Sequence, residues 1–135
     1  AQADEASDLN QSRLTISSLK GSTSEKFVNT LLPQSTSMPA ESYDLAVQAL
    51  LNGDANVMVA DYPFCVITKM RNPEANLLTL EEPLTVEPIG MALPADDPLL
   101  LNFMQNYFNA LKMTGLIDEL ETYWFESGNW LPQMK

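Results

Sequence analysis

The chain has no histidine, one cysteine, and only seven lysine and arginine residues against eighteen acidic ones. Without histidine the commonest general base and metal ligand is missing, so catalytic systems that pair serine or cysteine with histidine are excluded within this chain. Zinc would need several cysteines or histidines, and Cys65 stands alone. Its neighbours Phe64 and Val66 predict a buried structural thiol rather than a reactive one. We therefore expect no metal, no cofactor and no catalysis.

Positive charge is scarce, and the formal net charge is −11. No basic patch with interleaved aromatic residues occurs, so nucleic-acid binding is not expected, and anionic membrane surfaces are disfavoured. No apolar run approaches the length that spans a bilayer. The opening residues, AQADEASDLNQS, are small, polar and acidic, unlike a signal peptide, and predict a flexible leader over residues 1–12.

What remains is a chain of 135 residues, 45% hydrophobic, which is enough for one modest domain with a core. Hydrophobic periodicity predicts strands over residues 13–17, 57–60, 77–80 and 86–93, with a further short strand within 34–39. It predicts helices over 22–32, 40–51, 61–70, 98–113 and 116–125. This alternation indicates an α/β fold with a mostly parallel sheet flanked by helices. Pro83 and Pro88 reduce the last two strands to edge or crossing segments.

The turn Gly21-Ser22-Thr23-Ser24 lies between the first predicted strand and the first predicted helix. Its hydroxyls and free backbone N–H groups at a helix N-terminus favour an anion such as a carboxylate. Ordinary capping is the alternative, because Ser22 and Glu25 have the S-x-x-E spacing of a capping box.

A second candidate lies in the segment LLNGDANVMVAD, which predicts a helix end, a glycine stop, a short buried strand and then Asp61. In open α/β sheets, ligands bind beyond the carboxyl ends of the strands. Asp61 could hold a cationic group there, or it could cap the helix that begins near Pro63. Together with the Gly21 turn, it would match an ammonium and a carboxylate on one small molecule.

Four segments, in order and spacing, resemble the C-terminal part of a family 3 extracellular solute-binding protein, the amino-acid receptor of an ABC importer. They are KGSTSEKF, ALLNGDANVMVADYP, EPLTVEPIGMALPADDPLL and NALKMTGLIDELETYWF, and with the preceding strand they cover residues 13–125. The resemblance implies one lobe of a periplasmic-binding-protein type II fold. It also implies that Gly21, Ser22 and Thr23 bind the ligand's α-carboxylate and that Asp61 binds its α-ammonium.

Members of that family clamp the ligand between two lobes, and this chain resembles only the second lobe. The resemblance therefore implies a lobe over residues 13–88 and a C-terminal segment over 89–135 that normally packs on the first lobe. The helix over 98–113 has a wide apolar face, which should not stay exposed on a monomer. We expect it to redock on this chain's own sheet or to pack on a second copy, forming a homodimer by exchange of the C-terminal segment.

The resemblance implies a periplasmic or extracellular binding module for an amino acid or a related polar solute, with a membrane permease as partner and no catalysis. Alternatives from the same resemblance are the extracytoplasmic sensing domain of a signalling protein and a structural domain that keeps the fold without a ligand. An enzyme is a further alternative, since such folds are occasionally recruited for catalysis. The missing histidine and the lack of a close carboxylate pair argue against it.

Overall fold

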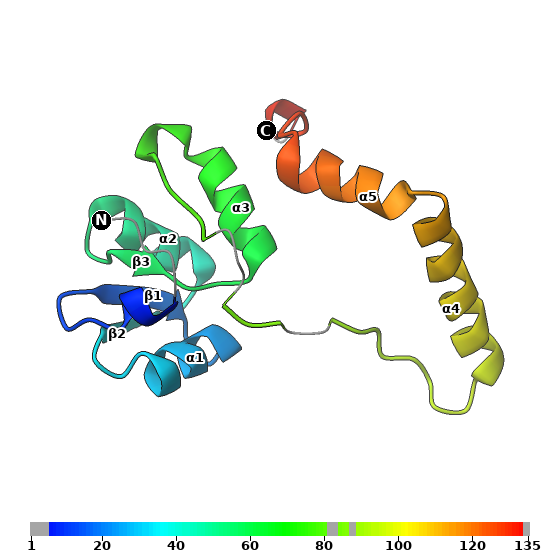
Figure 1. The fold of residues 1–135 in the computed structure, drawn as a ribbon, viewed down its shortest axis with the longest axis horizontal. Helices are drawn as coiled ribbons and strands as arrows, with labels where there is room; N and C mark the ends of the chain where they lie inside the picture. Colours follow the sequence, from blue (N-terminus) through cyan, green and yellow to red (C-terminus); the bar gives the residue numbers. More distant parts are fainter. Residues whose placement is uncertain (1–5, 81–83, 87–88, 134–135) are drawn as a thin grey trace. The chain divides into compact units, whose positions relative to one another are not determined.

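The computed structural model describes residues 6–80, 84–86 and 89–133. The chain forms two compact units, Ala1–Leu84 and Thr85–Lys135 (Figure 1). The division falls four residues before the boundary at residue 88 that the sequence predicted.

The first unit is built on a three-stranded sheet of β1 (Thr15–Leu19), β2 (Thr36–Ala40) and β3 (Val57–Met58). The strand order is β2-β1-β3, and both outer strands run parallel to the central β1. The ladder continues past β3, because the Val59 N–H donates to the Ser17 carbonyl at 2.9 Å. The predicted parallel α/β architecture is confirmed, with β1 shifted two residues from the predicted strand.

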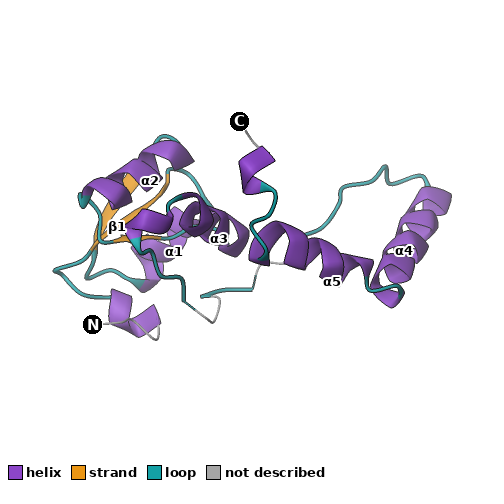
Figure 2. Ribbon diagram, turned by 90° about the horizontal axis from the view of Figure 1, so that it is seen from above, coloured by secondary structure: helices purple, strands orange, loops and turns teal. Residues whose placement is uncertain are grey.

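Three helices accompany the sheet: α1 (Thr23–Leu31), α2 (Tyr43–Asn52) and α3 (Tyr62–Arg71), the last followed by a short turn, η2 (Pro73–Ala75). Alternate residues of β1 face different helices, as a pleated strand requires. Ile16 packs in one cluster with Val28 of α1, whereas the Ser17 hydroxyl donates to the Ala46 carbonyl of α2. Figure 2 shows α1 and α2 on opposite sides of the strands.

The core of this unit lies on the α1 side of the sheet. Its buried members are Leu9, Ile16, Val28, Leu32 and Val59. Burial of each such side chain contributes about 1.5–3 kcal/mol, so this small cluster holds the sheet and α1 together.

Leu9 was not expected in this core. It ends a 3-10 turn, η1 (Ala6–Leu9), and the next residue, Asn10, accepts a hydrogen bond from the Gln34 N–H at 2.8 Å. Part of the predicted leader thus contacts the domain, through one apolar side chain and one side-chain amide. Residues 1–5 of that leader lie outside the described residues.

The second unit contains α4 (Pro98–Met113), α5 (Leu116–Glu121), a π-helical turn, η3 (Thr122–Glu126), and a final turn, η4 (Leu131–Gln133). The helix predicted over 116–125 thus changes to a wider turn after Glu121. Trp130 anchors the tail: it is buried, and its indole N–H donates to the Trp124 carbonyl at 2.8 Å.

The strands predicted over 77–80 and 86–93 are wrong for the described residues. Residues 77–80, 86 and 89–93 have no regular structure, and residues 87–88 lie outside the description. A strand needs a neighbour to pair with, and the proline residues along this stretch remove the donors that pairing would use. Apolar content alone therefore predicted more strands than the described residues form.

No residue of α4 is buried in this structure. Leu99 is 80% exposed and Met113 is 88% exposed, with Phe103 and Tyr107 also exposed. The wide apolar face is thus confirmed, while its cover by a second copy stays a prediction. None of the helices in the described part of the chain combines the length and the apolar character needed to cross a bilayer.

Candidate functional site

Both predicted junctions lie at the carboxyl edge of the sheet, on neighbouring strands. In the ladder, Ser17 of β1 pairs with Met58 of β3, and three residues beyond this pair come Lys20 and Asp61. Leu19 pairs with Ala40 of β2, so Glu41 follows beside Lys20. The fold therefore brings the Gly21 turn and Asp61 to the same edge, as the strand order requires.

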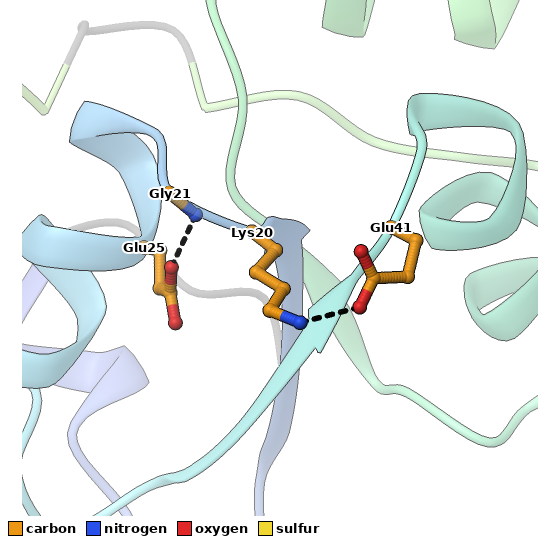
Figure 3. A network of polar contacts seen from close by, with 4 residues as sticks. All are labelled: Lys20, Gly21, Glu25 and Glu41. Atoms are coloured by element: carbon orange, nitrogen blue, oxygen red, sulfur yellow. Dashed lines mark hydrogen bonds and ion pairs between the residues drawn. The ribbon is translucent and has the colours of Figure 1, made fainter.

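At the first junction, nearby side chains already form hydrogen bonds with the backbone at the start of α1. The Ser22 hydroxyl accepts from the Glu25 N–H at 3.2 Å and donates to the Leu19 carbonyl at 2.6 Å. The Glu25 carboxylate accepts from the Gly21 N–H at 2.6 Å (Figure 3). The capping interpretation of this turn is thus confirmed, with Glu25 reaching back one residue beyond the N-cap. A negative carboxylate already lies where a helix N-terminus attracts an anion.

Gly21 has a backbone φ of +76°, and nothing lies within 4 Å of the place where a Cβ would be. The glycine is therefore required by the left-handed backbone and not by crowding inside the chain. The space beside the turn is open.

Lys20 supplies the cation of this edge, and it pairs with the Glu41 carboxylate at 2.5 Å (Figure 3). The hydrogen bond to Glu41, followed by its charge, raises the pKa of Lys20, with a smaller contribution from the Glu25 charge. Both side chains of the pair are exposed, so the bond adds little to stability. The pair matters for the charge of the edge, because the Glu41 carboxylate already neutralises the Lys20 ammonium.

The second junction differs. Asp61 is the N-cap residue of α3, with Pro63 in the first turn, but its side chain makes no capping hydrogen bond. Only its backbone carbonyl serves the helix, accepting from the Cys65 N–H at 3.1 Å. The Asp61 side chain is exposed and forms no hydrogen bond or ion pair with any residue that the structure describes. The capping interpretation therefore holds for its backbone and not for its carboxylate.

An aromatic pair lies beside Asp61. The rings of Tyr43, at the start of α2, and Phe64, in the first turn of α3, stack with centroids 4.3 Å apart. Partial burial raises the pKa of the Tyr43 phenol, and the nearby Asp61 and Cys65 raise it further. Burial likewise raises the pKa of the Cys65 thiol. The predicted structural character of Cys65 is consistent with this, although the residue is half-buried rather than buried.

Sequence reasoning missed Lys20, Glu41, Tyr43 and Phe64 as residues of this edge. A signal was present, because each stands within three residues of a strand end or a helix start. Their partners, however, lie about twenty residues away in the chain, and no local pattern pairs them.

Two hollows of the described residues lie away from the candidate edge. Within the described residues, one hollow of about 460 Å³ is lined by Phe27, Leu31 and Gln34 near the far end of α1, and one of about 450 Å³ lies along α5. Neither includes Gly21, Ser22, Thr23 or Asp61. Among those residues no cluster of acidic or cysteine side chains could hold a metal ion.

Comparison with known proteins gives structural relatives. No protein-family model and no curated protein sequence match the chain. A binding component of an ABC transporter from Wolinella succinogenes, complexed with lysine, matches with a TM-score of 0.84 and 30% identity over 96% of this chain. An ancestral cationic amino acid solute-binding protein matches with a TM-score of 0.78 and 31% identity over 93% of this chain.

A second structure of the same ancestral protein, described as a precursor of cyclohexadienyl dehydratase, matches with a TM-score of 0.70 and 28% identity over 92% of this chain. This chain spans only 56% of the lysine complex and 53% and 52% of the two structures of the ancestral protein. The ancestral protein is an amino-acid-binding protein, and the transporter component was crystallised with an amino acid. The fold of this chain is one lobe of a periplasmic-binding-protein type II fold.

Proposed function

We propose that this chain is a ligand-binding lobe of an amino-acid receptor, or of a receptor for a related polar solute, that serves an ABC importer and performs no catalysis. The observation that carries the proposal is Asp61: an exposed carboxylate at the carboxyl edge of the sheet that its own helix does not use. Such a group can accept hydrogen bonds from an ammonium. The lysine complex among the structural neighbours supports an amino-acid ligand.

The ligand's carboxylate would bind at the Gly21-Ser22-Thr23 turn. There the Glu25 carboxylate already accepts the Gly21 N–H, so a ligand carboxylate must displace it to reach that donor. The turn is open above Gly21, which permits such an approach. A periplasmic or extracellular location and a permease partner belong to the same proposal, supported by the ABC transporter component among the neighbours.

Binding to this chain alone should be weak. The neighbours are nearly twice as long as the matched segment, and neither hollow described above includes the candidate residues. Affinity depends on enclosing the ligand and on excluding water, and one lobe supplies little of either.

The proposal is tested by titrating the ¹⁵N-labelled chain with lysine, glutamine and leucine and following the backbone amide resonances. We expect millimolar binding, with the largest shifts in residues 20–25 and 61–65, and no tight binding in calorimetry. Asp61→Ala should weaken binding about tenfold or more, as expected for loss of a hydrogen bond to a charged group.

Asp54→Ala is the matched control, because Asp54 is an exposed aspartate just before β3, at the opposite end of that strand. It should leave the affinity unchanged. Unchanged affinity in Asp61→Ala, or no shifts with any amino acid, would contradict the proposal.

The alternative of a ligand-free structural domain has one observation in its favour. Glu25 satisfies the Gly21 N–H from within the chain, as a domain without a ligand would require. The same titration separates the two, since a ligand-free domain would show no saturable shifts.

A further inference from the structure

We propose that Tyr43 is a specificity-determining residue of this site and that, stacked on Phe64 beside Asp61, it selects ligands with a cationic side chain. This inference rests on the proposed function and goes one step further, from an amino acid to a positively charged one.

The first step is geometric. Tyr43 follows β2 and Phe64 follows β3, so their contact links two helix starts at the edge that carries Asp61. The ring planes meet at 28° with centroids 4.3 Å apart, which fixes the position of the Tyr43 ring. Phe64 stacks on one face of the ring, and the Tyr43 side chain is only half-buried, so part of it stays accessible. The charge of Asp61 acts on this side chain, so a ligand held by Asp61 would contact the accessible part.

The second step concerns the Tyr43 hydroxyl. It forms no hydrogen bond with any residue that the structure describes, although the side chain is partly removed from water. The negative charge of Asp61 acts on it, which is one reason why the pKa of Tyr43 is raised. A phenol oxygen in a negative field is a good acceptor for a cationic donor, and an aromatic face attracts a cation as well.

The third step is the charge of the edge. The carboxylates of Glu25, Glu41 and Asp61 lie here with the Lys20 ammonium, which is already paired with Glu41 (Figure 3). The chain as a whole carries a net charge of −11. A ligand with an extra positive charge is therefore favoured over a neutral zwitterion of the same size.

The test compares L-arginine with L-citrulline, which has nearly the same shape and a neutral ureido group. In amide-resonance titrations of the chain, arginine should bind about three- to fivefold more tightly than citrulline, as expected for an exposed cation–π contact. Arginine should also move the ring resonances of Tyr43, and citrulline should move them less.

Tyr43→Ala should bring the two affinities close to equality, while Tyr43→Phe, which retains the ring, should keep part of the preference. The dispersed amide spectrum of each variant checks that it folds. Tyr62→Ala is the matched control, because Tyr62 neighbours Asp61 in sequence but has no ring partner among the described residues. It should leave the preference for arginine unchanged.

The outcomes are distinguishable. Equal binding of both ligands that is lost in Asp61→Ala would overturn this inference and leave the proposed function standing. A preference for arginine that persists in Tyr43→Ala, or that disappears equally in Tyr62→Ala, would also overturn it. Absence of binding by either ligand would overturn both proposals.

Discussion

The two strand-to-helix junctions of the first unit share a sheet edge and a topology, yet they use their polar atoms differently. After β1, the hydroxyl of Ser22 and the carboxylate of Glu25 are both engaged in closing the start of α1. After β3, the side chain of Asp61 makes no capping bond, and α3 begins with the help of Pro63 instead.

This difference teaches how a cap can be told from a binding residue. A capping side chain is consumed by the backbone N–H groups of its own helix, whereas a binding side chain keeps its acceptors available. By that criterion the polar side chains of the Gly21 turn cap α1. The Asp61 carboxylate, in contrast, keeps its hydrogen-bond acceptors available for a ligand.

The largest loss of stability at either junction is expected from Gly21→Ala. A residue with a side chain in the left-handed conformation costs roughly 1–2 kcal/mol, and Gly21 has a φ of +76°. Amide hydrogen exchange in β1 and α1 should report this loss of stability. Gly90→Ala is the control, because Gly90 also has open space around it but no left-handed φ, and it should change little. Equal effects of the two variants would contradict the conformational reason.

The next prediction compares the N-cap residues of α1 and α3. Ser22→Ala should lower the free energy of unfolding by about 1 kcal/mol, because the Glu25 N–H loses its acceptor. Asp61→Ala should lower it by no more than about 0.5 kcal/mol, since only a helix-dipole interaction is removed.

Hydrogen exchange at the first turns of α1 and α3 measures both changes. Ser42→Ala serves as the positive control, because Ser42 accepts from the Leu45 N–H in the same way. A loss in Asp61→Ala as large as that in Ser42→Ala would remove the distinction between the junctions.

A smaller effect is expected from Glu25→Gln. The charge that now lies at the Gly21 N–H would be removed, so a ligand carboxylate should compete more easily for this donor. We expect amino-acid affinity to rise by about twofold, which corresponds to a helix-dipole contribution of about 0.4 kcal/mol. Glu74→Gln, on the η2 turn, is the control and should leave the affinity unchanged. Weaker binding in Glu25→Gln would show that the closed turn is the binding-competent one.

The smallest effect is a loss of stability in alkali. The pKa of Tyr43 is raised above its ordinary 10.0 and that of Cys65 above its ordinary 9.0, so both neutral forms are favoured by folding. Their contribution is complete below those ordinary values and is lost as the pH rises through the raised ones. Melting curves by circular dichroism at increasing pH should therefore shift downward above about pH 9, and less so in Tyr43→Phe. An identical alkaline shift in Tyr43→Phe would rule out a contribution from this phenol.

The sequence predicted the parts of this fold that depend on neighbouring residues. Ser22 with Glu25 and the glycine stop at Gly53 lie at helix ends as expected, because capping is decided within a few residues. The strands over 77–80 and 86–93 did not form, because a strand depends on a partner that sequence periodicity does not reveal.

The residues of the candidate site also fall into those suggested by local sequence and those that depend on distant partners. Gly21, Ser22, Thr23 and Asp61 were proposed as candidates because each follows a predicted strand, and their role in binding stays a prediction. The stack of Tyr43 on Phe64 and the pair of Lys20 with Glu41 were not found, because each joins residues twenty-one positions apart. Leu9 was missed because a polar, acidic segment conceals the single apolar residue that reaches the core.

The packing of Trp130 against Trp124 has a practical consequence for studies of this molecule. The chain has two tryptophans, and both lie in the C-terminal unit, with ring centroids 5.4 Å apart. Tryptophan fluorescence therefore originates in that unit, and the candidate edge contributes no tryptophan of its own. Unfolding curves from tryptophan emission and from far-ultraviolet ellipticity test whether the two units unfold together, and coincident curves would show a single cooperative transition.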